Sequence, residues 1–85
     1  MNTQMVEEIK EIIKKIVNYD SATITERSYL RNDLLIDSLM FIRLITEIEA
    51  KYEVYFESEK LYTQTDYTIE ELVEYVVELQ KEKIE

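Results

Sequence analysis

The chain contains three stretches in which apolar residues recur every three or four positions, as they do along one face of an α-helix. The first lies near the start of the chain, and Glu and Lys residues occupy its other positions. Its apolar positions are Met5, Ile9, Ile12, Ile13 and Ile16. This spacing predicts a first amphipathic helix that buries the apolar row.

The second stretch follows Asp37, a residue type that commonly caps the start of a helix. Lys51 lies near its other end, where a positive charge suits the helix dipole. The apolar positions are Leu39, Ile42, Ile45, Ile48 and Tyr52. We expect Leu39, Ile42, Ile45 and Ile48 to face the core. The flank then expected to face solvent consists of Met40, Arg43, Glu47 and Ala50.

A third helix is predicted to run to about Glu82. Thr68 and Glu71 have the spacing of a capping box, in which each side chain accepts a hydrogen bond from the backbone of the other residue. The apolar positions that follow are Ile69, Leu72, Val73, Val76, Val77 and Leu79. Together these features predict both the start of the helix and its buried face.

Two connections join these helices. The first, Asn18 to Asp37, is long for a compact domain and needs a packing or functional reason. Its apolar residues Ile24, Tyr29, Leu30, Leu34 and Ile36 are expected to hold it against the helices. In the second connection, the pattern leaves two alternatives open: Glu57 to Tyr62 could form one short helical turn, or Val54 to Phe56 could equally be locally extended. The chain has no Gly or Pro, so its turns depend on Asn, Asp and Ser.

Composition limits the possible functions. The 85 residues include 19 acids and 10 bases, a formal charge of -9 that disfavours binding to nucleic acid or to an anionic membrane. No apolar run is long enough to insert into a membrane, and no signal-peptide core is present, so a cytoplasmic location is expected. We expect one monomeric domain over residues 1–85, with partners that carry basic patches.

Independent catalysis is not expected from this sequence. Without Cys or His, the chain lacks thiol nucleophiles, thiolate or imidazole metal ligands, and the usual base near neutral pH. Its acidic residues also lack the spacing and glycine of a calcium loop, so no metal site is predicted.

The one chemical signal is Asp37-Ser38-Leu39, which lies where the long loop meets the second helix. This tripeptide occurs by chance in roughly a few per cent of chains this long, so alone it is poor evidence of a function. Asp37 capping a helix that begins at Ser38 would explain it fully. A phosphodiester attached to Ser38 would also be stabilised there by free backbone N–H groups and by the positive end of the helix dipole.

The residues around this tripeptide resemble the acyl carrier protein family. The resemblance rests on Leu34 to Leu39, on the apolar pattern of the second helix, on Ile24 and Tyr29-Leu30, and on Asp66 to Leu72. It implies an all-α four-helix bundle with three long helices, a short third helix and a long first loop. It also implies that the attachment serine is Ser38.

One position departs from the family pattern. The residue two before the aspartate is commonly glycine, and here it is Leu35. Two apolar residues before the Asp-Ser pair are similar to the D-alanyl carrier branch and to stand-alone carriers of specialised pathways. We therefore expect a specialised polyketide, nonribosomal peptide or aminoacyl pathway, with bulk fatty-acid synthesis as the alternative.

By this resemblance, Ser38 would carry a covalent 4'-phosphopantetheine arm that holds an acyl or aminoacyl thioester. A phosphopantetheinyl transferase using coenzyme A would attach the arm, and Asp37 would help to place the transferase's magnesium ion. A loading ligase and downstream biosynthetic enzymes would be the other partners. The alternative from another class is an unmodified helical adaptor that binds a partner through one face.

Overall fold

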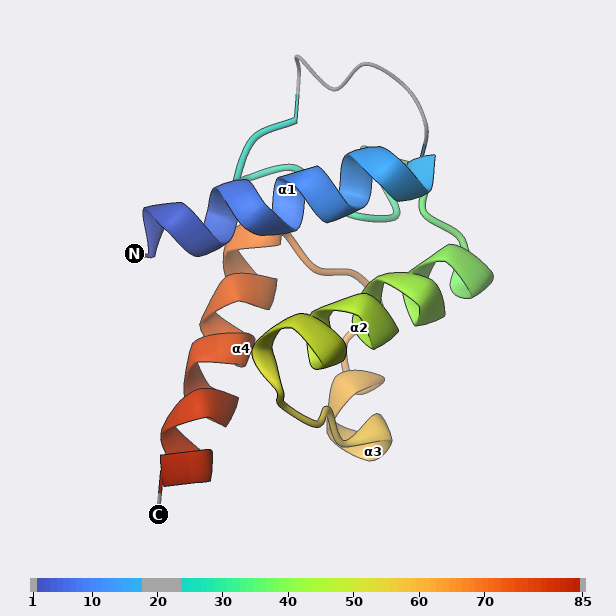
Figure 1. The fold of residues 1–85 in the computed structure, drawn as a ribbon. Helices are drawn as coiled ribbons and strands as arrows, with labels where there is room; N and C mark the ends of the chain where they lie inside the picture. Colours follow the sequence, from blue (N-terminus) through green and yellow to red (C-terminus); the bar gives the residue numbers. More distant parts are fainter. Residues whose placement is uncertain (1, 18–23, 85) are drawn as a thin grey trace.

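The computed structural model describes residues 2–17 and 24–84, with side chains placed as far as residue 82. The helices are α1 Thr3–Val17, α2 Ser38–Tyr52, α3 Ser58–Leu61 and α4 Ile69–Ile84. Figure 1 shows α1 lying across both α2 and α4, against which it packs, while the short α3 lies beyond the far side of α2. The described residues contain no strand, so the predicted all-α fold with three long helices and one short helix is confirmed.

The core lies between the three long helices. All five apolar residues predicted to face inward from α1 are buried, as are four of the six predicted on α4; the other two, Val77 and Leu79, pack against the core while partly exposed. The most deeply buried side chains are Ile9, Ile13, Leu30, Ile36, Leu44, Ile48, Ile69, Leu72, Val73 and Val76. Within the described part of the chain, no helix is long and apolar enough to cross a membrane.

The predicted buried face of α2 is partly wrong. Ile45 and Ile48 are buried, but the side chain of Leu39 is 78% exposed and that of Ile42 is 52% exposed. The reason is geometric: each residue turns the helix by about 100°, so a strict three-residue repeat drifts around the axis. Over nine positions the drift reaches half a turn, which places Leu39 opposite Ile48. The buried face instead consists of Phe41, Leu44, Ile45 and Ile48.

The start of α4 has the predicted capping box. The Thr68 backbone N–H donates to Glu71 Oε1 at 2.9 Å, and the Glu71 N–H donates to Thr68 Oγ1 at 3.1 Å. These bonds satisfy two backbone donors that a helix start leaves without intrahelical partners. The first residue of α4, Ile69, is completely buried, so the capped end is also anchored in the core.

A row of aromatic rings fills the space between α2, α3 and α4. Phe41 contacts Tyr62 edge-on and stacks with Tyr67, with ring centroids 6.0 and 6.4 Å apart. Tyr75 continues the row and meets Phe56 at 4.9 Å. The Tyr67 hydroxyl donates to the backbone oxygen at the end of α3, at 2.6 Å. The predicted short helix between α2 and α4 is thus present and is attached to the core through this row.

A polar contact links α1 to the end of α2. The Tyr52 hydroxyl donates to Glu8 Oε1 at 2.5 Å, and Gln4 Nε2 donates to the other carboxylate oxygen at 3.2 Å. The bond from Tyr52 is the main cause that holds the pKa of Glu8 below its ordinary value of 4.5. Burial, followed by the hydrogen bond to Glu8, raises the pKa of Tyr52 above its ordinary value. The pair is therefore most favourable as a neutral phenol and an ionised carboxylate.

Replacing Tyr52 with Phe should lower the free energy of unfolding at pH 7 more than at acid pH. A carboxyl group whose folded pKa is lowered adds stability above its unfolded pKa and loses that stability as pH falls through the folded pKa. In urea unfolding, the difference between the unaltered chain and Tyr52→Phe should therefore shrink between pH 7 and about pH 3. Tyr55→Phe, at a strongly exposed tyrosine, is the matched control and should change nothing. An equal loss at both pH values would mean that Tyr52 acts through packing alone.

Candidate functional site

The second half of the long loop is fixed against the start of α4. The Leu30 N–H donates to the Tyr67 carbonyl oxygen at 2.9 Å, and the Ile69 N–H donates to the Ser28 carbonyl oxygen at 3.2 Å. Of the five apolar residues predicted to hold this loop, the four that are buried are Ile24, Leu30, Leu34 and Ile36. The fifth, Tyr29, is 43% exposed and pairs with Thr68 through the backbone. Residues 18–23 of the predicted loop lie outside the described residues.

One carboxylate holds this loop against the turn before α4. Asp66 Oδ1 accepts hydrogen bonds from the N–H groups of Arg31 and Tyr67, at 2.9 and 2.8 Å, and its Oδ2 accepts from the Asn32 N–H at 3.1 Å. Hydrogen bonds to an ionised acceptor are stronger than those between neutral groups. Asp66 therefore joins two segments more than 30 residues apart and fixes the loop that leads to α2.

Leu35 follows the turn formed by residues 30–34 and has a left-handed backbone conformation, with φ of 57°. The conformation allows the Leu35 N–H to donate to the Arg31 oxygen at 3.1 Å and the Ile36 N–H to donate to the Leu30 oxygen at 2.9 Å. Leu34 and Ile36 are buried on either side, while the side chain of Leu35 itself is 78% exposed. A bulky residue in this region is strained, which explains why a glycine would suit the position.

Asp37 caps α2 as predicted. Its backbone is extended, its Oδ1 accepts from the Met40 N–H at 2.8 Å, and its carbonyl oxygen accepts from the Phe41 N–H at 2.8 Å. Ser38 is the first residue of the helix and is exposed. Among the described residues, the N–H groups of Ser38 and Leu39 have no partner, so they remain available to an anion attached at this end.

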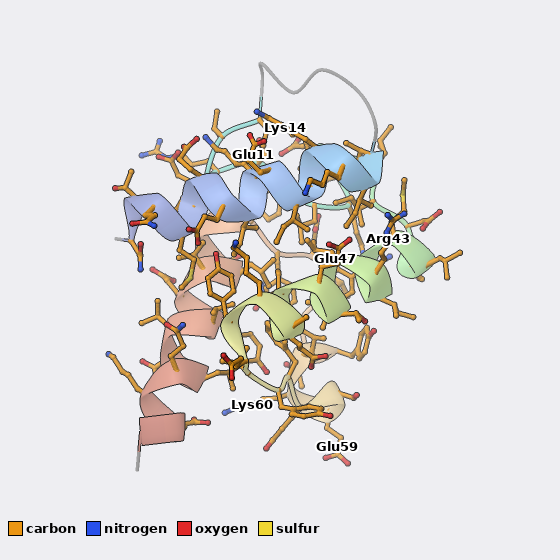
Figure 2. All side chains as sticks on the ribbon, in the orientation of Figure 1. Glu11, Lys14, Arg43, Glu47, Glu59 and Lys60 are labelled. Carbon is orange, nitrogen blue, oxygen red and sulfur yellow. The ribbon has the colours of Figure 1, made fainter. Side chains whose placement is uncertain are left out.

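The flank of α2 beside Ser38 differs from the predicted one. Arg43 and Ala50 are exposed as expected, but Met40 is half-buried and packs against the core. Leu39 and Ile42, which were expected to face the core, are exposed on the solvent-facing side of α2 instead. Figure 2 shows Arg43 and Glu47 close together on α2, where Arg43 Nε lies 3.6 Å from Glu47 Oε2. The exposed residues of α2 that follow Ser38 are therefore apolar, and Arg43 is paired with Glu47 on the same helix.

The site has no groups for catalysis of its own. Within the described residues, no hydrogen bond joins the Ser38 hydroxyl to a side chain that could remove its proton, and no cluster of three acidic residues could hold a metal ion. The hydroxyl is accessible but not activated. A reaction at this hydroxyl would therefore need a base supplied by another molecule.

Three contributors to the site were not foreseen from the pattern. The sequence pattern gives no role to Asp66, because its partners are distant in sequence. The predicted core lacks Phe41, although the spacing of Phe41 with Leu44, Ile45 and Ile48 follows the 3.6-residue period. The left-handed turn was missed because it is formed by Leu35, a residue type that gives no signal for positive φ.

Comparison with known proteins agrees with this geometry. A family model described as "Phosphopantetheine attachment site" matches residues 7–76, which include the loop, α2, α3 and the first half of α4. A curated "Acyl carrier protein" of Rubrobacter xylanophilus is 34% identical over 77 residues, covering 91% of this chain and 93% of that protein. Both matches extend well beyond the tripeptide around Ser38.

Replacing Leu35 with Gly should stabilise the fold by about 1 kcal/mol, because relief of a left-handed conformation exceeds the greater backbone freedom of glycine in the unfolded chain. Glu53, the other described residue with positive φ, lies at the opposite end of α2 and provides a matched case in Glu53→Gly. Both variants should unfold at higher urea concentration than the unaltered chain. If only Glu53→Gly is stabilised, the Leu35 side chain must make contacts that offset its strain.

Proposed function

Because the chain belongs to the acyl carrier protein family, we propose that Ser38 is the residue that bears its 4'-phosphopantetheine arm. The family's cofactor is this covalent arm, and its members are carriers and not enzymes. The observation that supports Ser38 most directly is its exposed position at the start of α2, immediately after a capping Asp37. The unpaired N–H groups there would stabilise the phosphodiester.

The attachment reaction defines what each participant supplies. The Ser38 oxygen forms a bond to the phosphorus of coenzyme A that carries pantetheine, the pyrophosphate bond breaks, and adenosine 3',5'-bisphosphate leaves. The transferase takes the hydroxyl proton, since the carrier offers no base. The carrier contributes an accessible hydroxyl on a rigid helix start, and the thiol at the end of the arm then holds the cargo as a thioester.

We assign the cargo to a specialised pathway, in which a ligase loads an acyl or aminoacyl group for downstream enzymes. Carriers of fatty-acid synthesis typically present several acids on the helix that follows the attachment serine. Here the exposed face begins with Leu39 and Ile42, and Arg43 is the first charged residue on it. Enzymes whose basic patches fit an acidic helix would find little to bind on this face. Bulk fatty-acid synthesis is therefore the second candidate.

Incubation with coenzyme A and a phosphopantetheinyl transferase of broad carrier acceptance should add one phosphopantetheine to the unaltered chain. Ser38→Ala should remain at its sequence mass while keeping its helical content, because Ser38 is exposed and fills no part of the core. Intact-mass measurement and circular dichroism check the two expectations. An unmodified helical adaptor would keep its sequence mass in both forms, and modification that persists in Ser38→Ala would refute the assignment.

The role proposed for Asp37 has two separable parts. Oδ1 caps the helix, which leaves the second carboxylate oxygen free to approach the magnesium ion of the transferase. Asp37→Asn should keep the cap but require more magnesium for the same rate of modification, whereas Asp37→Ala should also lose about 0.5 to 2 kcal/mol of stability. The measurement is the rate of modification across a magnesium titration. If Asp37→Asn matches the unaltered chain at every concentration, Asp37 serves as a cap only.

A further inference from the structure

Leu35 combines two unfavourable properties in one residue. Its backbone is held at φ 57°, which a side chain with a Cβ disfavours, and its side chain is 78% exposed to solvent. The hydrogen bonds and buried neighbours that fix the turn would be served at least as well by glycine. The folded structure of the chain alone therefore gives no reason for a leucine at this position.

Two further apolar residues close to Ser38 in the sequence are also exposed. Leu39 is 78% exposed and Ile42 is 52% exposed, and the two are neighbours on the outer face of α2. Ile42 and Leu39 also border an open groove together with Ile16, Met40 and Arg43. We call Leu35, Leu39 and Ile42 the apolar surface beside Ser38.

This part of the chain is also distinguished by its charge. Residues 31–46 contain two bases, Arg31 and Arg43, and two acids, Asp33 and Asp37, so they carry no net charge. All of the net charge of -9 is located elsewhere. Arg43 is paired with Glu47, and Arg31 lies 5.8 Å from the centre of the Phe41 ring. A partner that covers this region would gain more from apolar contact than from a basic patch.

Building on the proposed function, we propose that Leu35 is a docking residue for the phosphopantetheinyl transferase that modifies Ser38. Leu35, together with Leu39, enters an apolar depression beside the active site of that enzyme. The backbone hydrogen bonds of the turn and the buried side chains of Leu34 and Ile36 hold the Leu35 side chain outward before the enzyme arrives, so that no loop has to be ordered on binding.

The transferase is the partner that must come closest to Ser38. Enzymes that act on the cargo reach it through the arm, whereas the transferase must bring its reacting phosphorus to the Ser38 oxygen itself. An interface of standard size covers about 800 Å² on each partner, a patch with a radius of about 16 Å. Leu35 lies three residues from Ser38, within about 11 Å even for extended chain. Leu35, whose side chain is exposed, is therefore close enough to Ser38 to be covered by an interface centred on that residue.

The test measures the steady-state kinetics of phosphopantetheine transfer from coenzyme A to variants of Leu35. It uses a transferase that modifies the unaltered chain. Leu35→Asn removes the apolar contact but keeps a side chain tolerated at positive φ, while Leu35→Met keeps the apolar contact. Leu35→Gly removes both strain and contact. The control is Glu53→Gly, which relieves the same kind of backbone strain at the other end of α2, about 22 Å from Ser38 along the helix.

We expect Leu35→Asn and Leu35→Gly to raise the KM for the carrier about tenfold with little change in kcat, as expected when a binding contact is lost. Leu35→Met should stay within about twofold of the unaltered chain. Leu35→Gly should be modified more slowly although it melts at a higher temperature. Glu53→Gly should melt higher and be modified at the unaltered rate.

Several results would overturn the inference. Unaltered kinetics in Leu35→Asn and Leu35→Gly would show that the transferase does not contact Leu35, while Ser38 would remain the attachment residue. If kcat falls in Leu35→Asn and Leu35→Gly, and falls in Leu35→Met as well, Leu35 positions the loop and is not a docking residue. If no transferase modifies the unaltered chain at Ser38, the proposed function itself fails, and the inference fails with it.

Discussion

The position of Ser38 depends on the attachment of the long loop to the start of α4 through Asp66. Three backbone N–H groups from two distant segments converge on this one carboxylate. Without it, the N–H groups of Arg31 and Asn32 would lack these partners, and the loop would keep only its apolar anchors and its backbone hydrogen bonds to the start of α4. The turn that follows ends at Leu35, and two residues later Asp37 caps the start of α2. The direction of α2, and with it the exposure of Ser38, follows from this sequence of constraints.

The same constraints explain how a chain without glycine fixes the start of α2 at Ser38. Leu35 adopts the left-handed conformation because backbone hydrogen bonds and the buried side chains of Leu34 and Ile36 outweigh its local strain. The result is a fixed helix start with an apolar surface around an otherwise unactivated hydroxyl. A carrier needs this combination: accessibility and rigidity come from the carrier, whereas proton transfer and metal chemistry come from the enzymes that visit it.

Local signals in the sequence predicted the local structure well. The capping box of Thr68 and Glu71, the cap at Asp37 and the buried face of α1 all depend on residues within one or two helical turns of each other. The outer face of α2 was mispredicted because a three-residue repeat was extended beyond the length over which it stays on one side of a helix. The contacts of Asp66 and the backbone of Leu35 were not predictable in this way, because they depend on which distant segments pack together.

The most direct measurement is the intact mass of this protein isolated from its native cells, followed by fragmentation to locate any added group. A carrier with its arm at Ser38 should be found with a mass increased by one phosphopantetheine, with or without a thioester-bound cargo, and the addition should map to Ser38. A chain found only at its sequence mass from cells that contain an active phosphopantetheinyl transferase, or an arm on another residue, would contradict this account.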